Sequence, residues 1–169
     1  MLKGISPLFS PDLLATIYRM GHGEELVLAD AHFPAHQFND HVIRADGLQI
    51  PDLLEAILPL FEIDSYAADP VVTMDAVPGD SLNPAVEASY LDALSRHSNA
   101  SITRMERFAF YQRVRNAHAV VATGDTQKYA NIILKKGVTP IERSDWRNGG
   151  EPFGVRQDAN RDASGLTER

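Results

Sequence analysis

Residues 10–30 read SPDLLATIYRMGHGEELVLAD, and this stretch predicts one helix followed by one strand. Ser10 is suited to an N-cap, Pro11 to the first helical position and Gly21 to the end of the helix. The apolar face of this helix consists of Leu13, Leu14, Ile17 and Met20. The run from Glu25 to Ala29 then predicts a strand that ends on Asp30.

The same alternation of helix and strand continues along the chain. Pro51 opens a second helix, and Pro59 is expected to kink or end it. Asn83-Pro84 repeats the cap-then-proline signal and predicts a helix to about Arg96, with Val86, Tyr90, Leu91 and Leu94 facing inward. The remaining predicted elements are strands at 70–77, 101–105, 118–124 and 131–134 and a helix that contains Phe108, Tyr111 and Val114.

Residues 32–46 break this alternation. Pro34 and the polar residues around it interrupt any period, so a long loop is predicted here. Helices alternating with strands are typical of an α/β fold in which helices cover a sheet. The predicted fold class is therefore α/β.

The chain divides into a domain over residues 1–140 and a polar C-terminal extension over residues 141–169. The extension has 11 charged residues in 29 and four glycines, with few aliphatic residues, so it cannot form a core of its own. We expect a mostly extended arm, and Trp146 and Phe153 would anchor it if it docks on its own subunit or on a neighbour.

Composition excludes several classes of chemistry. The chain has no cysteine, which rules out disulfides, thiolate catalysis and cysteine-based zinc sites. It has no signal peptide and no apolar run long enough to span a membrane, so a cytoplasmic protein is expected. A net charge of −7 with scattered basic residues argues against nucleic acid or an anionic membrane as the main partner.

Histidines concentrate in one segment, where His22, His32, His36 and His41 lie within 20 residues. Ordinary loop histidines explain this as well as catalysis does. A metal site is disfavoured, because Pro34 interrupts the His32–His36 spacing and the Glu of a His-Glu-x-x-His motif is missing. In the catalytic interpretation His22, between two glycines, exchanges protons near neutral pH, and a carboxylate at the strand end orients the imidazole or binds a hydroxyl.

A phenol and an amide lie two residues apart at Tyr129 and Asn131. In a strand both would project from the same face and could bind sugar hydroxyls, although by spacing alone a half-buried tyrosine and a turn asparagine fit better. Arg107 by itself is most simply a solvated or paired helix charge.

Several separated blocks closely resemble the ribose pyranase and fucose mutarotase family. They are Met20-Gly21-His22-Gly23-Glu24-Glu25, Ala29-Asp30-Ala31-His32-Phe33-Pro34, Ile43-Arg44-Ala45-Asp46-Gly47-Leu48, Arg107-Phe108-Ala109-Phe110-Tyr111 and Tyr129-Ala130-Asn131-Ile132-Ile133-Leu134-Lys135-Lys136-Gly137. The similarity runs from Leu2 to about Pro140 and is greater to the fucose branch than to the ribose branch. It implies a three-layer fold in which helices flank a mixed sheet.

The resemblance also implies roles for individual residues. His22 matches the proton donor, and Asp30 matches a carboxylate that binds the substrate. Further substrate-binding positions are Arg107, Tyr129, Asn131, Asp64 and Tyr111. Family members need no cofactor or metal and form homo-oligomers, often decameric rings, with sites near subunit contacts.

The implied activity is an isomerase that interconverts the α and β anomers of L-fucopyranose by general acid/base ring opening. Alternatives are a pyranase for D-ribose, a mutarotase for another monosaccharide, and a sugar-binding protein of the same fold that does not turn over. The expected partners are a monosaccharide and further copies of the chain.

Overall fold

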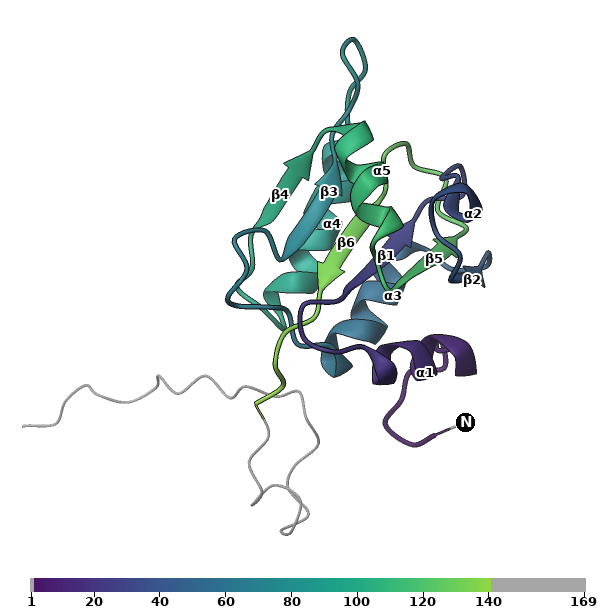
Figure 1. Ribbon diagram of the computed structural model, residues 1–169, viewed down its shortest axis with the longest axis vertical. Helices are drawn as coiled ribbons and strands as arrows, with labels where there is room; N and C mark the ends of the chain where they lie inside the picture. The colour runs from purple at the N-terminus through teal and green to yellow at the C-terminus, as the bar shows by residue number, and fades with distance from the viewer. Residues whose placement is uncertain (1, 141–169) are drawn as a thin grey trace, which may run out of the picture.

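Six strands form a single mixed sheet in the order β2-β5-β1-β6-β3-β4 (Figure 1). The computed structural model describes residues 2–140. The strands are β1 Glu25–Ala29, β2 Val42–Ala45, β3 Val71–Met74, β4 Ile102–Met105, β5 Ala119–Thr123 and β6 Ile132–Lys135. Five strands run parallel, and β6 runs antiparallel to its neighbours β1 and β3.

Helices cover both faces of this sheet. They are α1 Pro11–Arg19, α2 Ala35–Phe38, α3 Ile50–Ile57, α4 Pro84–Ser95 and α5 Arg107–Arg115, with a short 3-10 turn, η1 Leu58–Leu60, after α3. One core packs α1, α3 and α4 on one face, and a second core packs α2 and α5 on the other. Figure 1 shows α5 in front of the sheet and α3 and α4 behind it. The predicted three-layer α/β fold is confirmed.

Local signals place the helices where the sequence predicted them. The Ser10 hydroxyl accepts from the Leu13 backbone N–H at 3.1 Å, and the Asn83 side chain accepts from the Ala85 backbone N–H at 3.1 Å. Proline occupies the first turn of α1, α3 and α4, where its missing N–H is not needed. Pro59 lies in η1, so the expected end of α3 is confirmed.

Two details of the prediction are wrong. Residues 32–46 are not one loop, because they contain the single turn α2 and the edge strand β2. Both elements are too short for a sequence period, and of the β2 residues only Ile43 is buried. Leu91 does not face inward and is 44% exposed, since α4 buries Tyr90, Ala93 and Leu94 instead.

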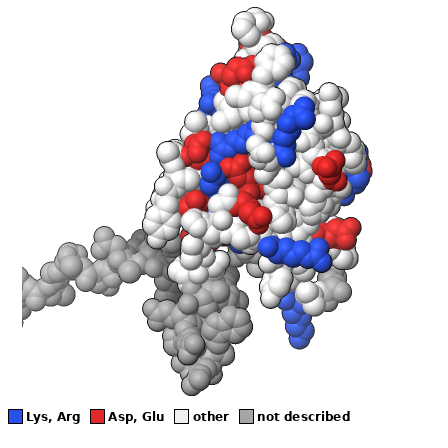
Figure 2. Space-filling view, in the orientation of Figure 1, with Lys and Arg blue, Asp and Glu red and all other residues white. Residues whose placement is uncertain are grey.

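The sheet and both cores are complete within residues 2–140. The predicted arm at 141–169, with Trp146 and Phe153, lies outside the described residues, and the domain division stays a prediction. None of the described helices has the length and apolarity to cross a bilayer. Lys and Arg side chains alternate with Asp and Glu over the face in Figure 2, without a broad field of one sign.

Candidate functional site

Polar residues lie at one end of the strands, where the five parallel strands finish and β6 begins. Asp30 follows β1, Asp75 follows β3, Glu106 follows β4 and Asn131 precedes β6. In α/β proteins the carboxyl ends of the strands are where ligand sites form. The topology therefore brings two of the predicted residues, Asp30 and Asn131, to one place.

Asp30 and Asn131 form a buried, reciprocal pair. The Asp30 backbone N–H donates to Oδ1 of Asn131 at 3.0 Å, and the Asn131 amide donates to Oδ2 of Asp30 at 2.8 Å. Oδ1 of Asp30 accepts from the His32 backbone N–H at 2.9 Å. Burial raises the pKa of the Asp30 carboxyl, and the hydrogen bonds from His32 and Asn131 oppose this rise. A carboxyl with a raised pKa is well suited to exchange protons with a bound substrate.

Tyr129 and Asn131 do not share a strand face, so that prediction is wrong. Tyr129 lies in the turn before β6 with φ 60°, and its carbonyl accepts from the Asn131 backbone N–H at 2.8 Å. A positive φ is unusual for a residue with a large side chain. The Tyr129 hydroxyl donates to Oδ2 of Asp80 at 2.9 Å.

Asp80 is a residue that the sequence reasoning missed. It belongs to the loop between β3 and α4, which projects at the top of Figure 1. Its carboxylate accepts from Tyr129 and lies 3.2 Å from Nζ of Lys128. The pKa of Asp80 is lowered by hydrogen bonds from the Ser81 backbone N–H, Tyr129 and Lys128. Within the Pro78-Gly79-Asp80 run it resembles an ordinary turn residue, so sequence gave no signal for this contact.

Arg107 begins α5 at the same end of the strands, directly after Glu106. Its Cζ lies 4.9 Å from the centre of the Phe108 ring, and its Nε is buried without a hydrogen-bond partner. Tyr111 lies one turn later in α5, and its predicted sugar contact stays a prediction. Its ring stacks on Phe38 at 4.5 Å in an aromatic cluster beside the core of α2 and α5.

His22 lies at the opposite end of β1. Its Nε2 is 3.4 Å from Oδ2 of Asp64, and its side chain is half exposed. The strand separates His22 from Asp30 by about 17 Å or more, at roughly 3.3 Å per residue over five residues. Asp64, and not Asp30, is therefore the carboxylate that contacts the imidazole. The structure does not bring His22 and Asp30 together within one chain.

The loop that carries His22 is held by backbone contacts. The Gly21 N–H donates to Oε2 of Glu24 at 2.6 Å, and the Gly23 N–H donates to the Lys136 carbonyl at 2.8 Å. Gly23 adopts φ 85°, a conformation that favours glycine. The Tyr66 backbone N–H is the main cause that lowers the pKa of Asp64, and His22 adds to it. Asp64 is thus an ionised partner for the imidazole.

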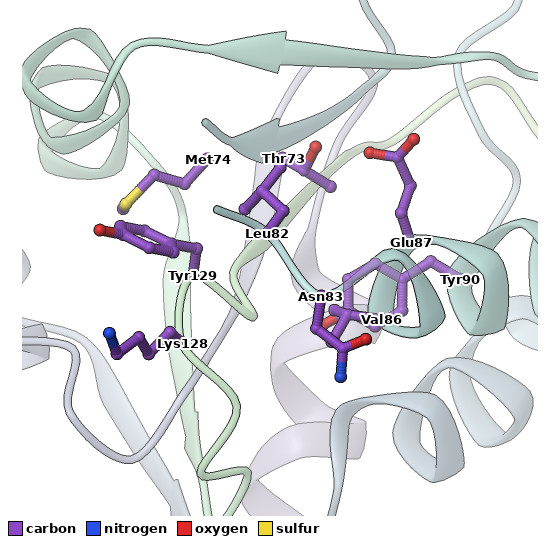
Figure 3. A pocket seen from close by; sticks show the side chains of 9 residues that line it. All are labelled: Thr73, Met74, Leu82, Asn83, Val86, Glu87, Tyr90, Lys128 and Tyr129. Carbon is purple, nitrogen blue, oxygen red and sulfur yellow. The ribbon is translucent and has the colours of Figure 1, made fainter. Parts of the chain in front are cut away.

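A pocket opens between the end of β3, the start of α4 and the turn at Tyr129. Figure 3 shows Thr73 and Leu82 between Tyr129 and Lys128 on one side and Val86 and Tyr90 on the other. The lining is mainly apolar, and the free interior accepts a group about the size of a methyl or a water.

Comparisons with known proteins show the family of this chain. The model of the RbsD / FucU transport protein family matches residues 3–139. Proteins named L-fucose mutarotase from Histophilus somni (strain 2336) and Glaesserella parasuis serovar 5 (strain SH0165) are each 59% identical to this chain. These matches cover 84% and 83% of this chain and 100% and 98% of the relatives.

Solved structures of the same fold were also found. The fucose mutarotase from Streptococcus pneumoniae, in complex with L-fucose, is 46% identical, with a TM-score of 0.79 over 82% of this chain and 99% of that chain. FucU from Bifidobacterium longum is 40% identical, with a TM-score of 0.74 over 80% of this chain and 99% of that chain. RbsD from Bacillus subtilis, complexed with D-ribose, is 21% identical over 82% of this chain and 99% of that chain, with a TM-score of 0.63, and shows the fold alone.

Proposed function

Because this chain belongs to the RbsD / FucU transport protein family, we propose that it interconverts the α and β anomers of L-fucose. The resemblance stated from the sequence blocks is confirmed by the family match. Relatives that are 59% identical over most of the chain carry the name L-fucose mutarotase, which confirms the predicted activity and its isomerase class. The D-ribose alternative depends on a neighbour that is only 21% identical.

The buried Asp30–Asn131 pair is the observation that carries the chemistry. Ring opening removes the proton of the anomeric hydroxyl, breaks the bond between C1 and the ring oxygen, and delivers a proton to that oxygen. Closure on the other face of C1 reverses these transfers, so no proton is gained or lost overall. Only an acid and a base are needed, and each is worth about 10² to 10⁴ in rate. A carboxyl with a raised pKa and fixed hydrogen bonds is suited to one of these roles.

If His22 is the proton donor, it has to come from a second copy of the chain. Within one chain His22 and Asp30 lie at opposite ends of β1, too far apart to touch one monosaccharide. The His22 side chain is half exposed and lies beside Tyr66, which is 83% exposed, so both are accessible to a neighbour. We propose a homo-oligomer in which His22 and Asp64 of one copy face Asp30, Tyr129, Asn131 and Arg107 of another. A decameric ring is the expected form.

Saturation-transfer NMR tests the activity directly. The exchange rate between the α and β anomers is measured for L-fucose, D-ribose and D-galactose, with and without protein. Acceleration of L-fucose exchange, with loss of that acceleration in His22→Gln, is expected. Acceleration of D-ribose alone would overturn the substrate, and sugar binding without exchange would support the non-catalytic alternative.

Mixing two inactive variants tests the shared site. His22→Gln and Asp30→Asn each remove one half of the proposed site. If the halves come from different copies, random reassembly of an equal mixture restores roughly a quarter of the activity. Each variant reassembled alone is the control. A mixture as inactive as its components would show that both residues act from the same copy.

We also propose that the protein works in the cytoplasm, where the sequence placed it. Cell fractionation with an antibody against the chain tests this, and recovery in a membrane or secreted fraction would contradict it.

A further inference from the structure

Three buried polar atoms lack a hydrogen-bond partner among residues 2–140. They are Oγ1 of Thr73, the hydroxyl of Tyr90 and Nε of Arg107. Burial without a partner is unfavourable for a polar group, so nearly all such groups in folded proteins find one. Arg107 is already a predicted sugar ligand. The other two atoms are the hydroxyls of Thr73 and Tyr90, and neither the sequence nor the family resemblance gave these residues a functional role.

Thr73 and Tyr90 line the same pocket beside Tyr129 (Figure 3). Thr73 is 5% exposed and Tyr90 is 1% exposed, and they come from β3 and α4 on the same face of the sheet. The lining is mainly apolar and includes Met74, Leu82 and Val86, and the polar residues Asn83, Glu87 and Lys128 complete it. The pocket therefore combines hydrocarbon walls with two hydroxyls that have no other partner.

The pocket adjoins the proposed sugar site. Tyr129 lines it, and Tyr129 precedes Asn131 by two residues. Burial raises the pKa of the Tyr90 phenol, and the nearby charges of Asp125 and Asp30 raise it further. Tyr90 therefore keeps its proton, so that it can donate a hydrogen bond.

We propose that Thr73 and Tyr90 form a subsite for the C4–C5 edge of a 6-deoxyhexose, which extends the proposed function. In L-fucose this edge carries a methyl group next to a hydroxyl. The apolar walls hold the methyl, and the two buried hydroxyls bind the 4-hydroxyl. The free interior of the pocket has the size of the methyl group alone, and the rest of the sugar lies outside it, over Asp30 and Asn131. The subsite makes the enzyme select for the methyl group.

Removal of each hydroxyl separates this role from a structural one. Tyr90→Phe and Thr73→Val keep the shape of the side chain and delete the polar atom. If the hydroxyls bind sugar, each variant raises KM for L-fucose about threefold to tenfold. If they serve only the fold, deleting an unpartnered buried group leaves KM unchanged and leaves stability equal or higher, and the inference fails. Tyr18→Phe and Thr103→Val, at exposed positions, are the matched controls.

Selectivity for the methyl group is tested with two other sugars. D-Arabinose lacks the C6 methyl of L-fucose, and L-galactose carries a hydroxyl on it. Leu82→Ala is expected to reduce the preference for L-fucose over D-arabinose about tenfold, because one wall of the pocket is lost. An unchanged preference would overturn the subsite while exchange of L-fucose by the wild type still supports the proposed function. A wild type that exchanges none of the three sugars would defeat the proposed function itself.

Discussion

The imidazole of His22 is oriented by a carboxylate from outside its own loop. Asp64 reaches it because the Asp64 backbone N–H donates to the Lys135 carbonyl, next to an isolated bridge between Ile63 and Lys136. A histidine that is half exposed has several rotamers available, and the contact with Asp64 selects among them. We therefore propose that Asp64 positions His22, whereas its predicted role as a sugar ligand stays untested.

Replacement of Asp64 tests this assignment. Asp64→Asn is expected to lower kcat for L-fucose about tenfold while KM changes little, because the imidazole loses its orienting charge. Steady-state anomer exchange measured by NMR gives both constants. Asp52→Asn, at an exposed position in the first turn of α3, should match the wild type. A rise in KM with an unchanged kcat would show instead that Asp64 binds the sugar.

We propose that Asp80 acts on the substrate through Tyr129, whose hydroxyl it binds. Asp80→Ala removes the acceptor of the phenolic hydrogen, so we expect KM for L-fucose to rise about tenfold as Tyr129 loses its fixed position. Asp80→Glu should recover part of this loss. Asp75→Ala is the control, since the Asp75 carboxylate only accepts from the adjacent Ala76 N–H. Equal effects of the Asp80 and Asp75 variants would show that the loop matters only as a whole.

Part of this site could be predicted from sequence. The rest could not, because it depends on contacts between segments that are far apart in the chain. Asp30 and Asn131 were identified by the resemblance, and their pairing follows from the ends of β1 and β6. The contacts of Asp64 with His22 and of Asp80 with Tyr129 join segments far apart in the chain. Nothing local to either aspartate indicates its partner, and the positive φ of Tyr129 is unexpected for a tyrosine.

At the scale of elements, the helices could be predicted more fully than the sheet. A helix start depends on a cap and a proline a few residues apart, as at Ser10-Pro11 and Asn83-Pro84, and such signals are local. The apolar run Ile132–Leu134 indicates a strand but carries no information about its direction or neighbours. Only the structure shows that β6 runs antiparallel between β1 and β3.

The junction of β5 with the loop after β2 depends on one glycine. A Cβ at Gly124 would lie 2.0 Å from the Asp46 carbonyl oxygen, and that backbone cannot move without disturbing β2. Gly124→Ala is expected to lower the free energy of unfolding by about 1–3 kcal/mol. Gly47→Ala, in the same loop with open space around its Cβ, should change it by about 0.5 kcal/mol or less. Urea unfolding of both variants decides between these expectations.

For the whole molecule, buried and paired carboxylates determine the response to acid. The pKa is lowered at Glu24, Asp64, Asp69 and Asp80, chiefly by hydrogen bonds from Gly21, Tyr66, Arg113 and Ser81 respectively. A lowered pKa in the folded state gives stability that is present above the unfolded pKa and lost as the pH falls through the folded pKa. Asp30 has a raised pKa, so its contribution is favourable in acid and is lost as the pH rises through that pKa.

With Asp46, whose pKa is lowered by the hydrogen bond from Arg44, five carboxyls with a lowered pKa outnumber Asp30, so acid should destabilise the protein. We expect the free energy of unfolding in urea to decline below about pH 4. Asp80→Ala should make this decline shallower, whereas Asp52→Asn should leave it unchanged. A free energy of unfolding that is constant between about pH 5 and pH 3 would contradict the assigned directions.

The position of β6 also has a consequence for biosynthesis. Among the strands of residues 2–140, β6 is the last to leave the ribosome, yet it joins the half-sheet β2-β5-β1 to the pair β3-β4. Until it emerges, β1 and β3 each present an unpaired edge, and exposed edges of this kind favour aggregation. Nascent chains stalled with β6 still inside the ribosome should therefore depend on chaperones, and the dependence should end once Lys135 has emerged.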